Sequence, residues 1–87
     1  MAGDAKAMAR RLTEARKAKG LDVDQIVAYL IERRMSAKSP KKRPLWIGTV
    51  REWFHYGLEE IPDEFGDDFK HICRLLDIPS IDDLWRN

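Results

Sequence analysis

Residues 22–31 are Asp22-Val23-Asp24-Gln25-Ile26-Val27-Ala28-Tyr29-Leu30-Ile31, and this stretch decides the fold class. Its large apolar side chains recur at the i, i+3, i+4, i+7 and i+8 spacing that puts them on one face of an α-helix. Asp22 is typical of a helix N-cap, and Gln25 three residues later forms a box-like pair with it. We therefore predict a helix that begins after Asp22 and ends by Ser36, within an all-α fold built on its apolar face.

A first helix is expected upstream, from Asp4 to Lys19. Asp4 suits the N-cap position, and Met8 and Leu12 recur at helical spacing. Gly20 follows directly, and glycine adopts the left-handed conformation that commonly ends a helix. The sequence thus predicts two helices joined by a short turn at Gly20.

Three further helices are expected downstream, which gives five in total. Thr49 and Glu52 have the Thr-x-x-Glu spacing of a capping box that opens a third helix, and Gly57 is expected to end it. A fourth helix is expected over residues 65–76, and a last short one after Ser80. The apolar positions predict one core, formed by Met8, Leu12, Ile26, Val27, Leu30, Val50, Trp53, Phe69, Ile72 and Leu76.

Length and composition indicate one globular domain, residues 1–87. A chain of 87 residues is too short for two cores with a deep cleft between them. Cys73 lacks a cysteine partner and lies on an apolar stretch, so we expect it in the core of a protein from a reducing compartment. No apolar run is long enough for a signal peptide or a membrane span. We therefore expect a cytoplasmic, nucleoid-associated protein without membrane contact.

The charge is unevenly distributed, although the net charge is only +1. Residues 1–53 hold 13 Lys and Arg against 6 Asp and Glu, whereas residues 54–87 hold 3 against 9. Such asymmetry suggests that the first part faces an anionic partner, of which nucleic acid is the commonest. The alternative is that the two oppositely charged parts pair with each other in the fold.

A basic loop is expected over residues 36–44, which contain two prolines and no apolar side chain larger than alanine. The Ser-Pro-Lys-Lys element at 39–42 resembles the one in basic chromatin tails that bind narrow, A·T-rich minor grooves. Prolines stiffen the segment, so its cations can reach phosphates at low ordering cost. The predicted phosphate contacts are Lys38, Lys41, Lys42 and Arg43. The alternative is a solvated loop that contacts nothing.

Three stretches resemble the lambda-repressor-like, or Xre/Cro, family of helix-turn-helix DNA-binding proteins. Residues 11–21 resemble its first helix, residues 22–30 its second, and residues 69–84 its closing leucine-rich helix, turn and short helix. The resemblance implies a five-helix domain whose third helix contacts bases. The family joins its second and third helices by a tight turn, whereas residues 31–44 intervene here, so we expect an extended basic loop between them.

Thr49-Val50-Arg51-Glu52-Trp53 is similar to the family's recognition helix, in which a β-branched core residue precedes a large apolar one by three positions. A recognition helix inserts its N-terminal turn into the major groove, where side chains meet base edges. The resemblance therefore implies a recognition helix around residues 47–56, with His55 near a phosphate. The implied DNA-binding residues are Ile47, Gly48, Thr49, Arg51, Glu52 and His55. The stretch also resembles, more weakly, the recognition helix of the MerR-like winged class.

The chemistry of these side chains suits base contacts. Arg51 can pair with guanine, Glu52 can accept from cytosine, and Thr49 or Ile47 can contact a thymine methyl group. The alternative is that Ile47 belongs to the core, Thr49 only caps the helix and Glu52 only completes the box. A purely structural role is less favoured for Arg51 than for these three residues.

Two positions depart from the family pattern. Val23 stands where many members have a glutamine that binds a phosphate, and Glu59 and Glu60 lie where members often present a cation. Those phosphate contacts are expected to be absent or repulsive here, so the basic loop is expected to replace them.

No enzyme is predicted. His55 and His71 lie too far from other ligand types for a metal site, and the one cysteine does not complete one. No nucleophile, acid-base pair or phosphate-binding glycine loop is evident. We therefore expect no cofactor, no metal and no small-molecule substrate.

The predicted function is a sequence-specific DNA-binding transcriptional regulator that binds double-stranded DNA as a homodimer, because one such helix makes few base contacts. Trp85 either folds back on Phe69 or packs across the dimer, and the dimer is slightly favoured. The alternative is a protein-interaction module, such as an antitoxin or adaptor subunit, that kept the fold without reading DNA. The apolar side chains of Trp46 and Ile47 favour that alternative.

Overall fold

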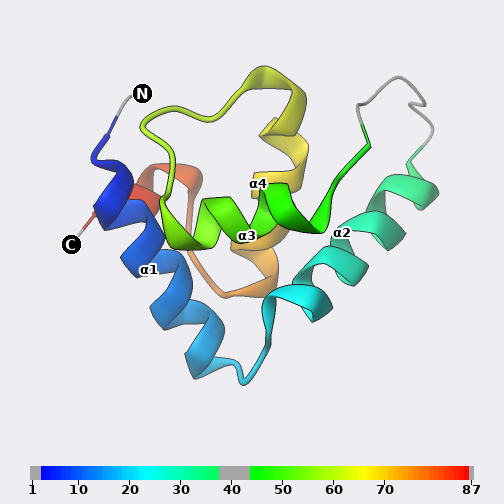
Figure 1. The fold of residues 1–87 in the computed structure, drawn as a ribbon, viewed down its shortest axis with the longest axis horizontal. Helices are drawn as coiled ribbons and strands as arrows, with labels where there is room; N and C mark the ends of the chain where they lie inside the picture. Colours follow the sequence, from blue (N-terminus) through cyan, green and yellow to red (C-terminus); the bar gives the residue numbers. More distant parts are fainter. Residues whose placement is uncertain (1–2, 38–43, 87) are drawn as a thin grey trace.

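A computed structural model of the protein describes residues 3–37 and 44–86, and over these residues it is all-helical (Figure 1). Two of the six elements are short 3-10 helices. The elements in chain order are α1 (Ala5–Ala18), α2 (Val23–Ser36), α3 (Ile47–His55), η1 (Asp63–Phe65), α4 (Gly66–Leu75) and η2 (Ile81–Trp85).

The predicted caps of α1 and α2 are confirmed. The Asp4 carboxylate accepts from the Lys6 amide over 3.0 Å, which satisfies one of the free amides at the start of α1. At α2, Asp22 and Gln25 form the full capping box, with reciprocal hydrogen bonds of 2.8 and 2.9 Å. Gly20 has the predicted left-handed conformation, at φ +66°. These local signals set the V shape that α1 and α2 form in Figure 1.

The predicted capping box of α3 is wrong. The helix begins at Ile47, and its N-cap is Trp46, which makes no side-chain capping bond. The Val50 amide already donates to the Trp46 carbonyl, over 3.2 Å, so Thr49 lies inside the first turn. The residues at this start are exposed, since Trp46 is 68% and Ile47 40% exposed, and the first buried side chain is Val50. The helix therefore begins near residue 47, where the family resemblance implied, rather than at the Thr-x-x-Glu pattern.

The C-terminal part differs from the prediction in its last element. Helix α4 lies within the predicted 65–76, but the expected short helix after Ser80 is the 3-10 helix η2. The Ser80 hydroxyl donates to the Asp83 carboxylate, over 3.3 Å, and caps no backbone amide. Segments of this length commonly form 3-10 turns, because only a few backbone bonds are available. The described residues thus form four α-helices rather than five.

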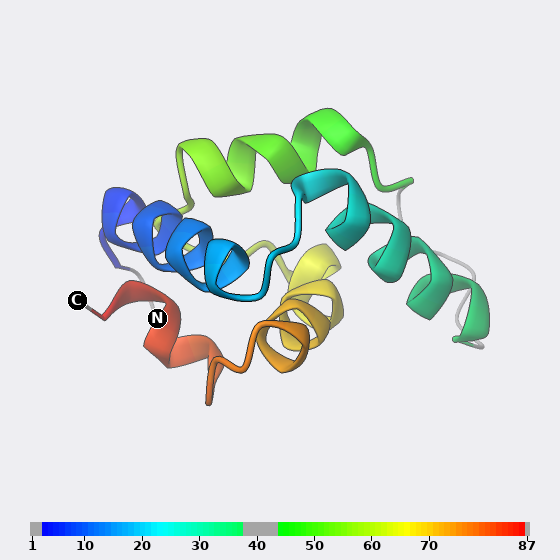
Figure 2. The same cartoon turned by 90° about the horizontal axis from the view of Figure 1, so that it is seen from below.

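One core holds the helices together. Helix α1 packs against α3 and η2, and α2 packs against α3 and α4. In Figure 2, α3 lies on one side of α1 and α2, and α4 and η2 lie on the other. All ten predicted core residues are buried in one cluster, which confirms that prediction. Trp53 stands at its centre, with its ring centroid 5.0 Å from that of Phe65 and 4.6 Å from that of Phe69.

Trp85 packs within its own chain. Its indole nitrogen donates to the Leu58 carbonyl over 2.7 Å, and Gly3 lies so close to the ring that a Cβ there would overlap it. The ring contacts the core beside Leu84, which is fully buried. The fold therefore accommodates this side chain without a second subunit, which removes the reason to expect Trp85 in a dimer interface.

Candidate nucleic-acid interface

The predicted cations of the basic loop, Lys38, Lys41, Lys42 and Arg43, lie outside the described residues. The candidate interface is therefore built from α3 and the helices beside it. No helix in the described part of the chain is long and apolar enough to cross a membrane. Within residues 3–37 and 44–86, no group of three or more His, Cys, Asp or Glu side chains is placed to hold a metal ion.

Helix α3 buries one side and exposes the other. Its buried residues are Val50, Trp53 and Phe54, at the spacing of one helix face. Five of the six residues predicted to meet DNA lie on the opposite side: Ile47, Gly48, Arg51, Glu52 and His55, which we call the α3 face. The sixth, Thr49, is half-buried at its edge.

The structure decides between the alternatives left open for this helix. Ile47 is 40% exposed, so it is not a core residue. Thr49 and Glu52 lie within the helix and form no capping box. A Cβ on Gly48 would meet nothing within 4 Å, so the backbone here is open to a closely approaching surface. The His55 ring lies edge-on against the ring of Tyr56, with centroids 4.4 Å apart.

Arg51 is turned toward α2. Its guanidinium donates to the Asp24 carboxylate over 3.2 Å, and both side chains are more than 60% exposed. An exposed pair of this kind contributes less than about 1 kcal/mol, because water screens it and both side chains lose rotamer freedom. Asp24 therefore positions Arg51 at the edge of the α3 face. The pair is weak enough that Arg51 can exchange Asp24 for another anionic or polar partner.

A groove of about 410 Å³ runs between α1 and α3, and we call it the cationic groove. Arg16 and Lys17 of α1 and Arg51 and His55 of α3 line it. The Thr13 hydroxyl donates to the Phe54 carbonyl over 3.0 Å and joins the two helices at its floor. This arrangement places cations from two helices beside the C-terminal half of α3, from Arg51 to His55.

Arg16 is only partly satisfied. One of its terminal nitrogens donates to the Leu21 carbonyl over 2.8 Å, but its Nε is buried without a hydrogen-bond partner among the described residues. A buried guanidinium nitrogen without an acceptor is unfavourable. An anionic acceptor in the cationic groove is the kind of group that Arg16 lacks.

The cations of α1 extend the same surface. Lys6, Arg10 and Lys17 are exposed, and an adjoining groove lined by Lys6 and Arg10 continues to His55. The sequence analysis missed these residues because it assigned phosphate contacts only to the loop and to His55. Their i, i+4 and i+11 spacing is the signal that could have found them, because it gives one helix face.

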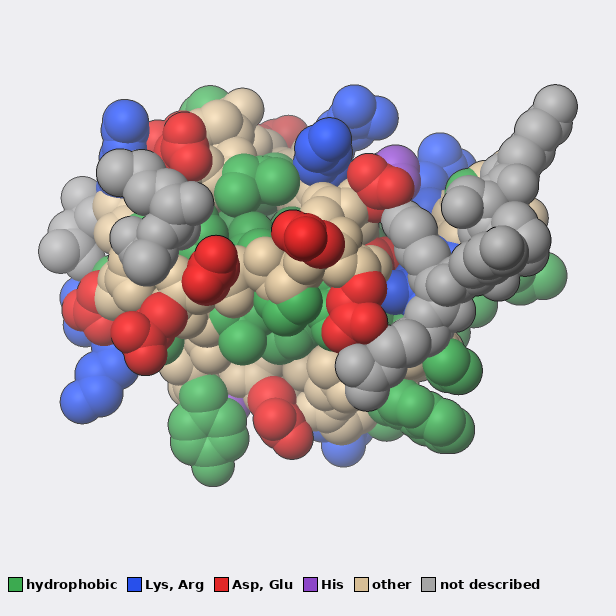
Figure 3. Space-filling view, turned by 90° about the horizontal axis from the view of Figure 1, so that it is seen from above, with side chains coloured by type: hydrophobic (Ala, Val, Ile, Leu, Met, Phe, Trp, Pro, Cys, Tyr) green, Lys and Arg blue, Asp and Glu red, His purple; other side chains and the backbone are tan. Residues whose placement is uncertain are grey.

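A cluster of acidic residues lies outside the candidate interface, although Glu52 is on the α3 face, Asp24 pairs with Arg51 and Glu14 lines the adjoining groove. Figure 3 shows Asp and Glu side chains gathered over the connector between α3 and α4, where Glu59, Glu60 and Asp63 are exposed. A phosphate backbone is repelled by such a surface.

Comparison of the chain with protein-family models, curated proteins and solved structures gave no match. The resemblance to the lambda-repressor-like family therefore stays a prediction.

Proposed function

We propose that this protein is a sequence-specific DNA-binding transcriptional regulator that inserts the α3 face into the major groove. The observation that carries the proposal is that α3 exposes one side while cations of α1 and α3 line the groove beside it. In this proposal α2 and α3 are the helix-turn-helix unit of a lambda-repressor-like domain, with a long basic connection. It acts as a homodimer on double-stranded DNA in the cytoplasm, associated with the nucleoid.

Each side chain has a distinct task in this proposal. Arg51 leaves Asp24 and pairs with guanine, at a cost of less than about 1 kcal/mol, and Glu52 accepts from cytosine. Ile47 contacts a thymine methyl group. Lys17 and His55 contact phosphates on the flanks of the groove, as do the cations of the loop.

Selection of bound duplexes from a random pool tests the function. We expect an enriched sequence that binds at least about tenfold more tightly than random duplex, measured by fluorescence anisotropy at fixed salt. Arg74→Ala is the matched control, because Arg74 is an exposed arginine on α4, away from the α3 face. Arg51→Ala should lose the preference for the enriched sequence, whereas Arg74→Ala should keep it. Equal affinity of the parent for selected and random duplex contradicts sequence-specific binding.

Exposed apolar side chains favour a second function, that of a protein-interaction module. Met35 is 82% exposed and Trp46 is 68% exposed, and Ile31 is exposed one turn before Met35. Met and Trp are enriched at protein interfaces, where a partner removes them from water. Two results together favour this second function over the first. The selection enriches no duplex, and Lys17→Gln leaves the affinity for random duplex unchanged.

A further inference from the structure

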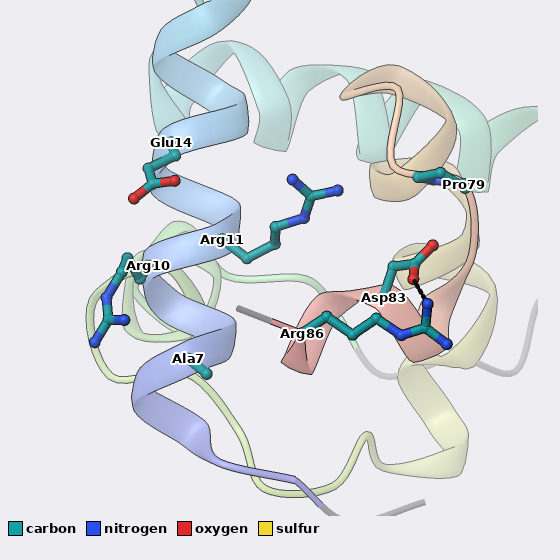
Figure 4. Close-up of a pocket in the computed structure, with 7 residues that line it drawn as sticks. All are labelled: Ala7, Arg10, Arg11, Glu14, Pro79, Asp83 and Arg86. Carbon is teal, nitrogen blue, oxygen red and sulfur yellow. Dashed lines mark ion pairs between the residues drawn. The ribbon is translucent and has the colours of Figure 1, made fainter.

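A second cleft lies between α1 and η2. Figure 2 shows η2 on the opposite side of α1 from α3. Its volume is about 560 Å³. Ala7 and Pro79 contribute small apolar walls, and Arg11, Asp83 and Arg86 contribute charge (Figure 4). We call it the Arg11 cleft. Arg10 and Glu14 at its rim also line the groove that adjoins the candidate nucleic-acid interface, whereas Arg11, Asp83 and Arg86 do not.

Arg11 reaches into this cleft from α1. Figure 4 shows its side chain directed toward the segment that carries Pro79 and Asp83. The side chain is half-buried, and no described residue accepts a hydrogen bond from its guanidinium or forms an ion pair with it. A guanidinium presents five donors in a fixed fork, so Arg11 offers an unused binding group inside a concave site.

The opposite wall holds a second guanidinium. Arg86 pairs with Asp83 over 3.1 Å, and Asp83 also accepts from the Ser80 hydroxyl over 3.3 Å. Arg10 and Glu14 line the rim, but Figure 4 shows their side chains directed away from Arg11 and Arg86. Because Asp83 already neutralises Arg86, the cleft retains the positive charge of Arg11.

We propose that the Arg11 cleft binds a small molecule through a carboxylate or phosphate group held between Arg11 and Arg86. Guanidinium forks match the oxygen atoms of both anions in bidentate geometry. The uncharged part of the ligand lies against Ala7 and Pro79, which give it an apolar surface. The anion supplies Arg11 with the acceptor that the described residues do not give it.

Three probes with the same ring test this site: benzoate, phenylphosphate and benzyl alcohol. Each is titrated into the full 87-residue protein, without DNA, while amide signals are followed by two-dimensional NMR. We expect saturable shifts at Ala7, Arg11 and Asp83 with benzoate, phenylphosphate or both, and none with benzyl alcohol. The anion that binds more tightly identifies the group. The absence of saturable shifts with both anions overturns the proposal, and leaves the proposed DNA binding untouched.

Variants locate the binding group. Arg11→Gln should weaken binding about tenfold or more, because a charge-assisted hydrogen bond is lost. Lys17→Gln removes one positive charge from the same helix at a position outside the cleft, and should leave affinity unchanged. Equal weakening by both variants overturns the proposal. Asp83→Asn should tighten binding because it frees Arg86. If the amide spectrum of Arg11→Gln shows that this variant is unfolded, the test rests on Asp83→Asn. Binding of the anionic probes by Asp83→Asn that is unchanged or weaker than that of the parent then overturns the proposal.

Discussion

Arg34 on α2 and Asp68 on α4 form a bidentate ion pair inside the helix bundle. Arg34 Nε donates to Asp68 Oδ1 over 2.9 Å, and Nη2 donates to Oδ2 over 2.6 Å. Asp68 is only 1% exposed, so this pairing replaces nearly all the water its carboxylate would otherwise bind. The hydrogen bond with Asp68 raises the pKa of Arg34 above its usual value. The pair fixes the C-terminal half of α2 against α4.

Breaking this pair from one side should destabilise the fold strongly. Asp68→Asn leaves Arg34 with a neutral partner, and we expect it to lower the free energy of unfolding by about 3 kcal/mol, measured by urea denaturation. The double variant Arg34→Met/Asp68→Leu removes both charges, and should be much closer to the parent.

The exposed pair of Arg51 and Asp24 is the control for this prediction. Asp24→Asn should change the free energy of unfolding by less than about 1 kcal/mol, because water screens that pair. If Asp68→Asn and Asp24→Asn lower the free energy of unfolding by equally small amounts, the buried Arg34–Asp68 pair does not stabilise the fold as we predict.

The core predicts a second large effect. Leu30→Ala should cost about 2–5 kcal/mol of unfolding free energy, because Leu30 is fully buried and its removal leaves a cavity. Ile31→Ala is the matched control on the same helix, and should cost much less because Ile31 is exposed. Denaturant melts of the two variants check the difference. A Leu30→Ala protein as stable as the parent would show that this part of the core is loosely packed.

Cys73 gives the protein a dependence on alkaline pH. Burial raises the pKa of its thiol from the usual 9.0 to about 11, with a further contribution from Asp83. Because the folded-state pKa lies above the unfolded one, the stabilisation is complete below pH 9 and is lost as the pH rises toward 11. The free energy of unfolding should therefore fall between pH 9 and pH 11.

Cys73→Ala isolates this dependence from the titration of Lys and Tyr side chains. The parent should lose more stability than the variant between pH 9 and pH 11. Identical slopes in the two proteins would show that the thiol does not contribute. Alkylation of the native parent by iodoacetamide at pH 8 should also be slow, since the reactive thiolate is scarce.

Local sequence patterns predicted most of the helices, but they did not predict contacts between residues far apart in the sequence. Asp22, Gln25 and Gly20 lie beside the helix ends that they set, and so the sequence shows their role directly. Arg34 and Asp68 lie far apart in the sequence, so no local pattern pairs them. The Thr-x-x-Glu pattern misplaced the start of α3, because the N-cap is Trp46 and Thr49 makes no capping bond.

The candidate site was predicted in part for the same reason. The resemblance to the family's recognition helix implied Ile47, Arg51 and His55, and the structure has all three side chains exposed. The cations of α1 and the Arg11 cleft depend on which helices pack together, and a single sequence does not show that packing. The pairing of Arg51 with Asp24 likewise requires the crossing of α2 and α3.

Trp85 should stabilise the subunit rather than a dimer. Trp85→Phe removes the hydrogen bond to the Leu58 carbonyl, and we expect a loss of about 1 kcal/mol in unfolding free energy. Sedimentation of Trp85→Phe should give the same mass as the parent, whatever that mass is. A shift toward a smaller species would restore Trp85 to an interface between subunits.

Arg51 and Lys17 should fail differently if the protein binds DNA as proposed. Lys17 is exposed on α1 beside the cationic groove, so it can follow the phosphate backbone but is not placed to contact a base. Lys17→Gln should weaken binding to all duplexes alike, and should lower the magnitude of the salt slope by about one unit. Arg51 lies on a fixed helix and can hold a bidentate geometry against one base.

Arg51→Ala should therefore cost about 1–3 kcal/mol on the selected duplex while binding to random duplex stays nearly unchanged. Anisotropy titrations of both variants over a series of salt concentrations measure the two effects side by side. Asp24→Asn serves as a further control, because freeing Arg51 from its partner should keep or tighten the specific complex. If Arg51→Ala and Lys17→Gln both lower affinity for every duplex equally, Arg51 contacts phosphate and α3 does not read sequence.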